Sequence, residues 1–168
     1  MDIKIVDNFL DPIDLKKVQN YTFTNPHTPK KWKIQQSNVD REDASNQFLE
    51  CEASDDEYFN TYLWNKVKKH LDGNYKLERV YFNGQWSGRE GQFHDDGCDI
   101  TALLYLNDYE YGWGGFTEIL SSIEKPVILH PLTNRLVIFP GRIKHKGYSF
   151  AYQRCPMRIS LAFKLNTK

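Results

Sequence analysis

The sequence predicts a mainly β protein, a sandwich or barrel, with helices packed on one outer face. From residue 76 onward, short apolar runs alternate with Gly, Asn, Asp and Pro, which is the pattern of such folds. Before residue 76, helical signals dominate, and helices that precede a run of strands commonly pack against the outside of the sheets. We expect one domain over residues 1–168, with helical support over about 1–75 and a β core over about 76–168.

The first helix is predicted by its start signal. Residues 3–9 alternate as in a strand, and Asp11 and Pro12 then match an N-cap followed by proline at the first helical position. We expect this helix to run to about Tyr21. Residues 24–53 are polar and irregular, so they predict a long loop with short strands.

A second helix is predicted over residues 54–73. Ser54 and Glu57 form a capping-box pattern, and Gly73 supplies a stop signal. Apolar residues follow at helical spacing: Phe59, Tyr62, Leu63, Val67 and Leu71.

The predicted strands then follow in order at about residues 76–84, 91–95, 99–107, 115–120, 126–129, 135–139, 145–150 and 157–165.

Charge and cysteine content exclude several classes of protein. Lys and Arg total 22 and Asp and Glu total 22, so the formal net charge is zero, which gives no basic excess for nucleic-acid binding. Three cysteines without metal-ligand spacing indicate a reducing compartment. The sequence shows no signal peptide and no apolar stretch long enough to span a bilayer, so we expect a cytoplasmic protein with no membrane partner.

A candidate metal site lies in the segment 91–97. His94 and Asp96 are two residues apart, and in an extended strand such residues project to the same side. His145, on a later strand, is the best third ligand. Two imidazoles and one carboxylate leave three octahedral positions open, as in non-haem Fe(II) oxygenases. Two of the open positions can chelate a 2-oxo acid. A His-x-Asp pair alone is a weak signal, and a histidine is more often structural.

A candidate anion site lies on the last strand. In residues 157–165, Ile159, Leu161, Phe163 and Leu165 share one face, while Arg158, Ser160, Ala162 and Lys164 share the other. An arginine buried inside a barrel needs an anionic partner, which the distal carboxylate of 2-oxoglutarate would supply. The plainer interpretation places Arg158 in solvent on an edge strand. The neighbouring metal motif favours the first interpretation.

From about Val80 to Lys164 the sequence resembles the prolyl 4-hydroxylase-like branch of the Fe(II)/2-oxoglutarate dioxygenases. The resemblance rests on the His-x-Asp motif and on four later segments, 101–107, 113–119, 134–139 and 158–161. It implies a double-stranded β-helix, a cupin-like jelly-roll barrel flanked by helices. It further implies Fe(II), the co-substrates 2-oxoglutarate and O2, ascorbate as a candidate reductant, and a hydroxyl group from Tyr105 to the distal carboxylate of 2-oxoglutarate.

Several residues remain as alternatives or additions. Arg154 competes with Arg158 because the segment after His145 is longer than the family pattern; we prefer Arg158, which opens the alternating strand. His130 is an alternative third ligand. The Gly-rich segment 83–91 is either a flap, with Trp86 and Arg89 meeting substrate, or a plain surface loop. Tyr81 either lines the pocket or packs in the core. His27 and His70 are expected to be uninvolved in the site.

The resemblance implies release of succinate and CO2 and favours a prolyl residue in a peptide or protein as substrate. A free amino acid or another small metabolite is the alternative within the same enzyme class. An oxidative nucleic-acid demethylase is a further alternative, but its terminal Arg pattern is only half matched here, and the net charge is zero. A non-catalytic jelly-roll module that binds a metal or ligand is the rival from another class.

Overall fold

The computed structural model describes residues 2–23, 32–36, 47–120, 125–151 and 155–168. Its strands form two antiparallel sheets. The order in the seven-stranded sheet is β1 (Lys4–Val6), β8 (Leu136–Pro140), β5 (Ile100–Tyr105), β10 (Arg158–Thr167), β4 (Tyr75–Gln85), β3 (Gln47–Glu52) and β2 (Lys33–Gln36). The order in the three-stranded sheet is β7 (Val127–Leu129), β6 (Thr117–Ile119) and β9 (His145–Gly147).

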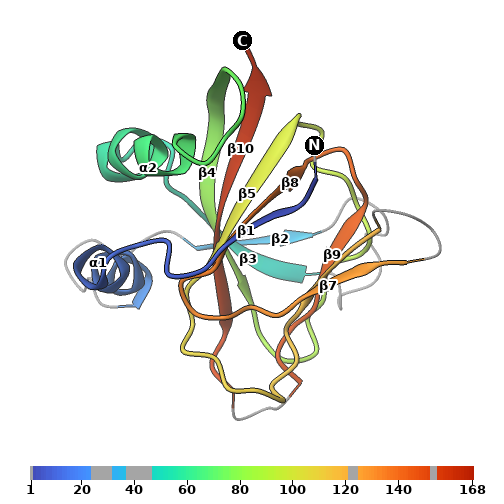
Figure 1. Ribbon diagram of the computed structural model, residues 1–168. Helices are drawn as coiled ribbons and strands as arrows, with labels where there is room; N and C mark the ends of the chain where they lie inside the picture. Colours follow the sequence, from blue (N-terminus) through green and yellow to red (C-terminus); the bar gives the residue numbers. More distant parts are fainter. Residues whose placement is uncertain (1, 24–31, 37–46, 121–124, 152–154) are drawn as a thin grey trace.

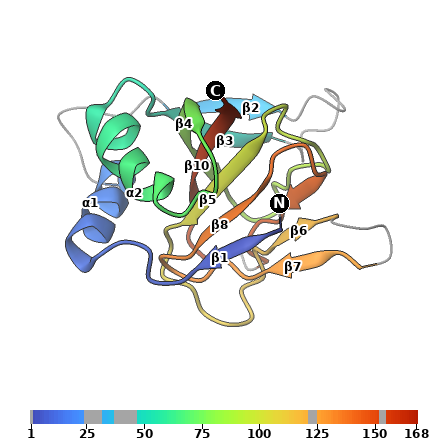
Figure 2. The same ribbon diagram turned by 45° about the horizontal axis from the view of Figure 1, so that its top comes forward.

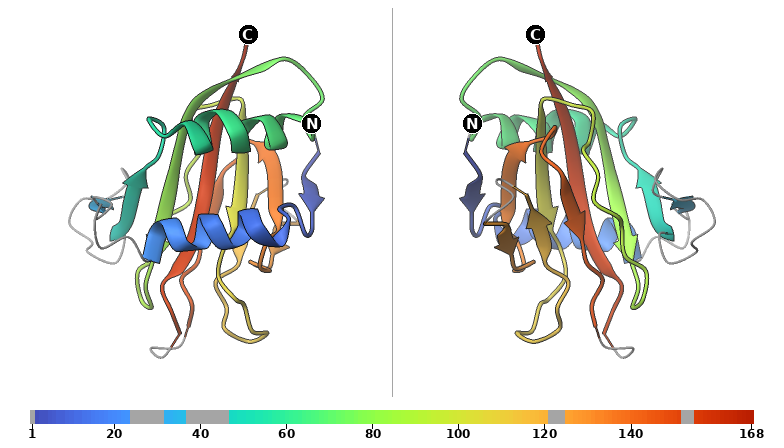
Figure 3. Two further views of the ribbon diagram at one scale, coloured as in Figure 1. Left: turned by 90° about the vertical axis from the view of Figure 1, so that its left-hand side faces the viewer. Right: turned by 90° about the vertical axis from the view of Figure 1, so that its right-hand side faces the viewer.

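The helices cover one face of the seven-stranded sheet, and the three-stranded sheet lies on the opposite side (Figure 1). These helices are α1 (Pro12–Phe23), the π-helix η2 (Tyr58–Leu63) and α2 (Trp64–Lys68). Viewed from the helical side, α1 and α2 run across the strands, and both termini lie toward the end where α2 crosses (Figure 3, left). The mainly β architecture with helices on one face is therefore confirmed.

The main hydrophobic core lies between the helices and the large sheet. Strand β10 contributes the alternating apolar face predicted from its sequence: Ile159, Leu161, Phe163 and Leu165, each at most 1% exposed. These side chains pack with Phe59 and Val18 from the helices. Complete burial of such a side chain contributes about 1.5–3 kcal/mol, so this face holds the central strand firmly in place.

The first helix begins as predicted and the second does not. The Asp14 amide donates to the Asp11 side chain at 2.9 Å, which is the expected N-cap. In the second helix, the Ser54 hydroxyl bonds Glu52 instead of capping, and the Tyr58 amide donates to the Asp56 side chain at 3.0 Å. The capping-box prediction is therefore wrong, because the Ser54 hydroxyl is engaged by Glu52 of β3 and by the backbone of Val80 in β4. The helix also ends at Lys68, before Gly73.

The predicted 24–53 loop contains two short strands, β2 and β3, which extend the large sheet beyond β4. Residues 24–31 and 37–46 lie outside the described residues. The predicted strand at 91–95 is wrong: this segment forms only one isolated bridge, between His94 and His145.

The two sheets face each other without closing into a barrel, as the turned view also shows (Figure 2). Among the described residues, β9 meets the 91–95 segment only at the His94–His145 bridge. The expected barrel is thus an open sandwich of the double-stranded β-helix type. Between the sheets lies a cavity of about 780 Å³, within the range of small-molecule sites.

Candidate metal centre and anion pocket

His94, Asp96 and His145 meet in the cavity between the sheets. One ligand atom from each residue lies within 4.8 Å of the others. The His145 Nε2 atom is 3.3 Å from Asp96 Oδ2, and the His94 Nε2 atom is 3.6 Å from Asp96 Oδ1. The side chains of Asp96 and His145 are 6% and 8% exposed, whereas that of His94 is 41% exposed, so the cluster opens toward solvent beside His94.

Backbone groups orient both histidine rings. The Nδ1 atom of His94 is 2.8 Å from the Gln92 carbonyl oxygen, and that of His145 is 2.8 Å from the Ile143 carbonyl oxygen. Each ring is therefore oriented by its Nδ1–H group, and its Nε2 atom faces the carboxylate of Asp96, where an ion would be bound. The two backbones also exchange hydrogen bonds at 3.1 and 2.9 Å, which holds the histidines side by side.

Asp96 is held as a carboxylate. Burial would raise its pKa, but hydrogen bonds with His145 and His94 and the charge of Lys164 lower the pKa far below its usual range. Its backbone amide donates to the Gly141 carbonyl oxygen at 2.8 Å, which fixes the segment against the end of β8.

The donor set fits a divalent transition metal. Two imidazole nitrogens and one anionic oxygen converge from two segments, and the backbone bonds to both Nδ1 atoms match those of ligating histidines elsewhere. The structure thus brings together the three residues predicted from the sequence.

Arg158 is the first residue of β10 and is 2% exposed. On the same face of this strand, Lys164 lies beside Asp96. The Arg158 Nε donates to the Gly115 carbonyl oxygen at 2.7 Å, Nη1 to Gln85 Oε1 at 2.7 Å and Nη2 to Thr117 Oγ1 at 2.9 Å. All three partners are neutral. Among the described residues, no carboxylate forms an ion pair with Arg158. Burial lowers its pKa, yet a guanidinium remains charged.

Tyr105 lies behind Arg158 and not in the cavity wall. Its ring centroid is 5.3 Å from the guanidinium carbon, and its hydroxyl donates to Thr117 Oγ1 at 2.8 Å. Thr117, in contrast, lines the cavity. Because Thr117 Oγ1 accepts bonds from Arg158 and Tyr105, its own proton is free to donate into the cavity. A contact from Tyr105 to a bound anion stays a prediction.

The other substrate candidates occupy different places. Tyr81 lines the cavity between Arg79, which lies 4.2 Å from its ring centroid, and Lys164, at 5.7 Å. Trp86 and Arg89 form a turn closed by a 3.0 Å backbone bond and are absent from the described cavity wall. Substrate contacts by all three remain predictions.

The alternative ligands are placed as follows. Arg154 and His27 lie outside the described residues. His130 lies on the surface, with Nδ1 3.3 Å from the Tyr109 hydroxyl, and does not belong to the metal cluster. His70 packs against Phe9 at 5.5 Å on the helical side.

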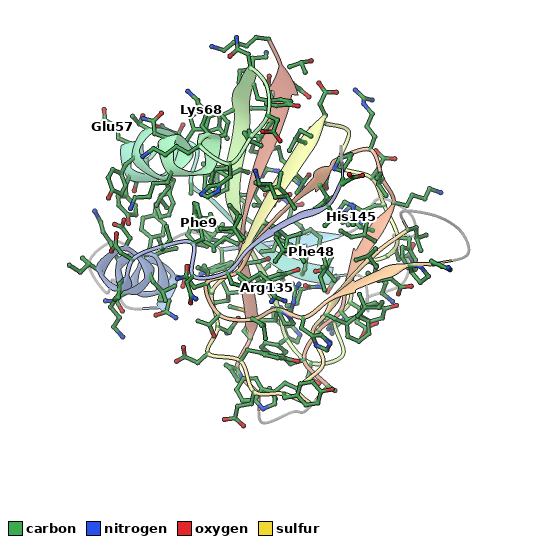
Figure 4. The ribbon with its side chains drawn as sticks, viewed as in Figure 1. Phe9, Phe48, Glu57, Lys68, Arg135 and His145 are labelled. Atoms are coloured by element: carbon green, nitrogen blue, oxygen red, sulfur yellow. The ribbon has the colours of Figure 1, made fainter. Side chains whose placement is uncertain are left out.

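Some cavity residues escaped sequence reasoning: Phe48, Gln85, Thr101, Thr117 and, in its contact with Asp96, Lys164. Figure 4 shows Phe48 and His145 on the side of the sheet away from Glu57 and Lys68. The alternation of β10 already placed Lys164 on the inner face. The others lie on strands whose register only the fold reveals.

None of the helices in the described part of the chain is long and apolar enough to span a membrane. No family model and no curated protein matches this sequence.

Solved structures do resemble the fold. A prolyl hydroxylase from Trichoplax adhaerens, in complex with a hypoxia inducible factor oxygen degradation domain peptide fragment, matches with a TM-score of 0.73 and 19% identity over 98% of this chain and 83% of that chain. A 2OG-Fe(II) oxygenase family oxidoreductase from Burkholderia pseudomallei matches at 0.68 with 10% identity, over 98% and 85%. HygX from Streptomyces hygroscopicus, with nickel, 2-oxoglutarate and hygromycin B bound, matches at 0.68 with 8% identity, over 99% and 83%. The chain therefore has the double-stranded β-helix fold of the 2-oxoglutarate Fe(II) oxygenases.

Proposed function

We propose that this protein is an Fe(II)- and 2-oxoglutarate-dependent dioxygenase. One observation carries the proposal: a single cavity contains both a two-histidine, one-carboxylate cluster and a buried arginine without an acidic partner among the described residues. A buried cation without a counter-charge is costly, so Arg158 favours an anionic ligand. An acid that chelates the metal and carries a second carboxylate would bind the metal cluster at one end of the cavity and Arg158 at the other.

The hydrogen bonds of Arg158 support a position for the second carboxylate. A guanidinium has five N–H donors, and protein acceptors take three of them, one on Nε and one on each terminal nitrogen. One donor remains on Nη1 and one on Nη2, which is what the two oxygens of a carboxylate need. The free Thr117 proton adds a further donor at the same place.

The space between the two ends suits a short, flexible acid. On the inner face of β10, only Ser160 and Ala162 lie between Arg158 and Lys164, which contacts Asp96. Both side chains are small, so the cavity stays open from the guanidinium to the metal cluster. Leu103 and Phe139 contribute apolar wall that excludes water.

Within this site, His94, Asp96 and His145 would hold the metal and Arg158 with Thr117 would orient the co-substrate. The Fe(II) ion would supply the oxidative chemistry that protein side chains lack. With O2 as the oxidant, turnover would convert 2-oxoglutarate to succinate and CO2, one oxygen atom entering succinate and the other entering the substrate.

For the substrate, we propose a prolyl residue in a peptide or protein. The fold neighbour from Trichoplax adhaerens is a prolyl hydroxylase with a bound peptide, and Phe48, Tyr81 and Phe93 give the cavity aromatic walls suited to an apolar ring. A polar small molecule is the second candidate, because Arg79, Lys144 and Asn166 also line the cavity and HygX has hygromycin B bound.

The test is turnover of 2-oxoglutarate to succinate with Fe(II), in the presence of proline-containing peptides and of small metabolites, with mass spectrometry for added oxygen. We expect turnover in the wild type and its loss in His94→Ala and Asp96→Ala, because each removes a metal ligand. Near-normal turnover in both variants would contradict the assignment.

The same assay has a control against a non-catalytic binding module. His130→Ala removes a surface histidine outside the cluster and should leave turnover unchanged. Anaerobic titration of Fe(II) with 2-oxoglutarate should give a visible charge-transfer band in the wild type. A module that only binds ligand would show neither the band nor succinate.

A further inference from the structure

Lys164 is a buried cation in direct contact with the candidate metal ligand Asp96. Its side chain is 12% exposed, and its ammonium group forms an ion pair with Asp96 Oδ2. It also lies 3.4 Å from Thr101 Oγ1 and 5.7 Å from the ring centroid of Tyr81. Nothing in the proposed binding of co-substrate uses this lysine.

The two oxygens of Asp96 have unequal surroundings. Oδ2 accepts a hydrogen bond from Thr101 at 2.5 Å, pairs with Lys164 and lies 3.3 Å from His145. Oδ1 has one neighbour among the described contacts, His94 Nε2 at 3.6 Å. Oδ2 is thus occupied by protein donors, whereas Oδ1 is the oxygen free to bind an ion.

This difference affects coordination. A carboxylate with both oxygens free can chelate an ion and take two positions, whereas a carboxylate with one oxygen occupied takes one. Two histidines and one carboxylate oxygen leave three of about six positions open. A chelating 2-oxo acid needs two of these, so a second Asp96 oxygen would remove the last open position.

We propose that Lys164 is a positioning residue that, together with Thr101, occupies Asp96 Oδ2 and thereby limits Asp96 to one metal–oxygen bond. The inference rests on the proposed metal site. It assigns the buried ammonium a second effect, because a cation near a divalent ion opposes its binding. Lys164 therefore lowers metal affinity and preserves open coordination positions.

A purely structural role for Lys164 would have the opposite effect on metal binding. If the lysine only balanced the buried charge of Asp96, its removal would loosen the carboxylate and weaken metal affinity. The direction of the change in affinity therefore separates the two roles.

The test uses the full-length protein and Mn(II), which accepts oxygen and nitrogen ligands and whose effect on water proton relaxation reports the number of bound waters. Lys164→Met and Lys164→Gln are both uncharged and similar in length, but only glutamine can donate to Oδ2. Affinity is measured by calorimetry and bound water by relaxivity per bound Mn(II).

We expect Lys164→Met to bind Mn(II) about tenfold more tightly than wild type, within the scale of changes beside a metal ligand, with relaxivity lower by about one third as three bound waters become two. Lys164→Gln should gain similar affinity and keep the wild-type relaxivity. Lys68→Met is the matched control, since Lys68 is exposed on α2, on the helical side of the large sheet and away from the cavity, and should change neither value.

Unchanged relaxivity or weaker Mn(II) binding in Lys164→Met would overturn the inference. A wild type that binds no Mn(II) would instead contradict the proposed metal centre itself. If Lys164→Met does not fold, Thr101→Val carries the test, because it removes a donor to Oδ2 and keeps the ion pair. It should lower relaxivity with little change in affinity, and wild-type relaxivity in it would overturn the inference.

Discussion

At the scale of single residues, Arg158 combines burial, charge and incomplete hydrogen bonding. Its neutral partners fix the guanidinium plane and leave one N–H on each terminal nitrogen without a described protein acceptor, and Arg158 lines the cavity. Gln85 has a supporting part, because its Nε2 also donates to the Gly147 carbonyl oxygen at 3.0 Å and so links β4 to β9 behind the guanidinium.

Replacing Arg158 should therefore weaken co-substrate binding. We expect Arg158→Met to raise the KM for 2-oxoglutarate at least thirtyfold, since loss of a buried charged partner costs about 2–5 kcal/mol. Mn(II) affinity should stay near wild type, because the metal ligands are untouched. Arg142→Met is the control, as its side chain is 70% exposed and pairs with Asp99. An unchanged KM in Arg158→Met would leave the carboxylate role to another residue.

Spacing could place residues that are close in sequence, whereas His145 was chosen as the third ligand that the His-x-Asp pair requires. His94 and Asp96 share a short segment, and Arg158 and Lys164 share one strand, so spacing alone predicted their common direction. Thr117 could not be found this way. Its position beside Arg158 depends on how the small sheet faces the large one, which no local pattern records.

At the scale of elements, one acidic side chain ties the two helical segments together. Asp14 on α1 is 6% exposed. It accepts hydrogen bonds from Tyr58 and Tyr62 of the π-helix, each at 2.9 Å, and pairs with Lys66 of α2 at 2.6 Å. The π-helix places Tyr58 and Tyr62 on the same side, with their rings stacked 5.3 Å apart.

Removal of the Asp14 side chain, and with it these contacts between the helices, should destabilise the helical layer. We expect Asp14→Ala to lower the free energy of unfolding by about 2–3 kcal/mol, because three donors lose a largely buried acceptor. Urea denaturation followed by circular dichroism measures it. Glu78→Gln removes an exposed ion pair with Lys76 and should lower the free energy of unfolding much less. Equal losses in the two variants would show that Asp14 contributes no more than a surface charge.

Strong local signals predicted element types better than element ends. The Asp11 cap and the alternation of β10 are local and were confirmed. The second helix starts at a different cap because β3 and β4 engage Ser54, which is a tertiary contact. The strand expected at 91–95 did not form, because within this segment only His94 pairs with another strand, at His145 of β9.

At the scale of the whole molecule, the candidate metal centre links the small sheet to the segment that leads into the large sheet. His145 begins β9 of the small sheet, and it exchanges backbone hydrogen bonds with His94, which precedes β5 of the large sheet. An ion bound by both side chains would join these segments at the same point. Metal binding should therefore stabilise this junction more than the core beneath the helices.

Hydrogen–deuterium exchange tests this. With Mn(II) at a hundredfold excess over its dissociation constant, we expect amide exchange at residues 94–96 and 143–147 to slow by up to about a hundredfold. Amides of β4 and β10 that face each other in the large sheet should change little. Uniform protection across all strands would instead indicate that the metal stabilises the fold as a whole.

The broad architecture followed from the sequence because apolar periodicity and turn residues are distributed along the entire second half. Closure of the barrel did not follow. Closure depends on whether edge strands of the two sheets come within hydrogen-bonding distance, and among the described strands none of one sheet pairs with a strand of the other. The single-domain organisation and the cytoplasmic location both stay predictions.

Both faces of β10 make essential contacts, so substitutions on β10 and on β3 should differ in their consequences. Alternate residues of this one strand support the helices and line the reaction space, so a change in the volume of Phe163 shifts its neighbours Ala162 and Lys164 as well. Phe48 lies on β3, near the margin of the sheet, where a new side chain alters the cavity mouth and leaves the centre alone. Directed evolution toward another substrate should accordingly accept many residues at position 48 and few along β10.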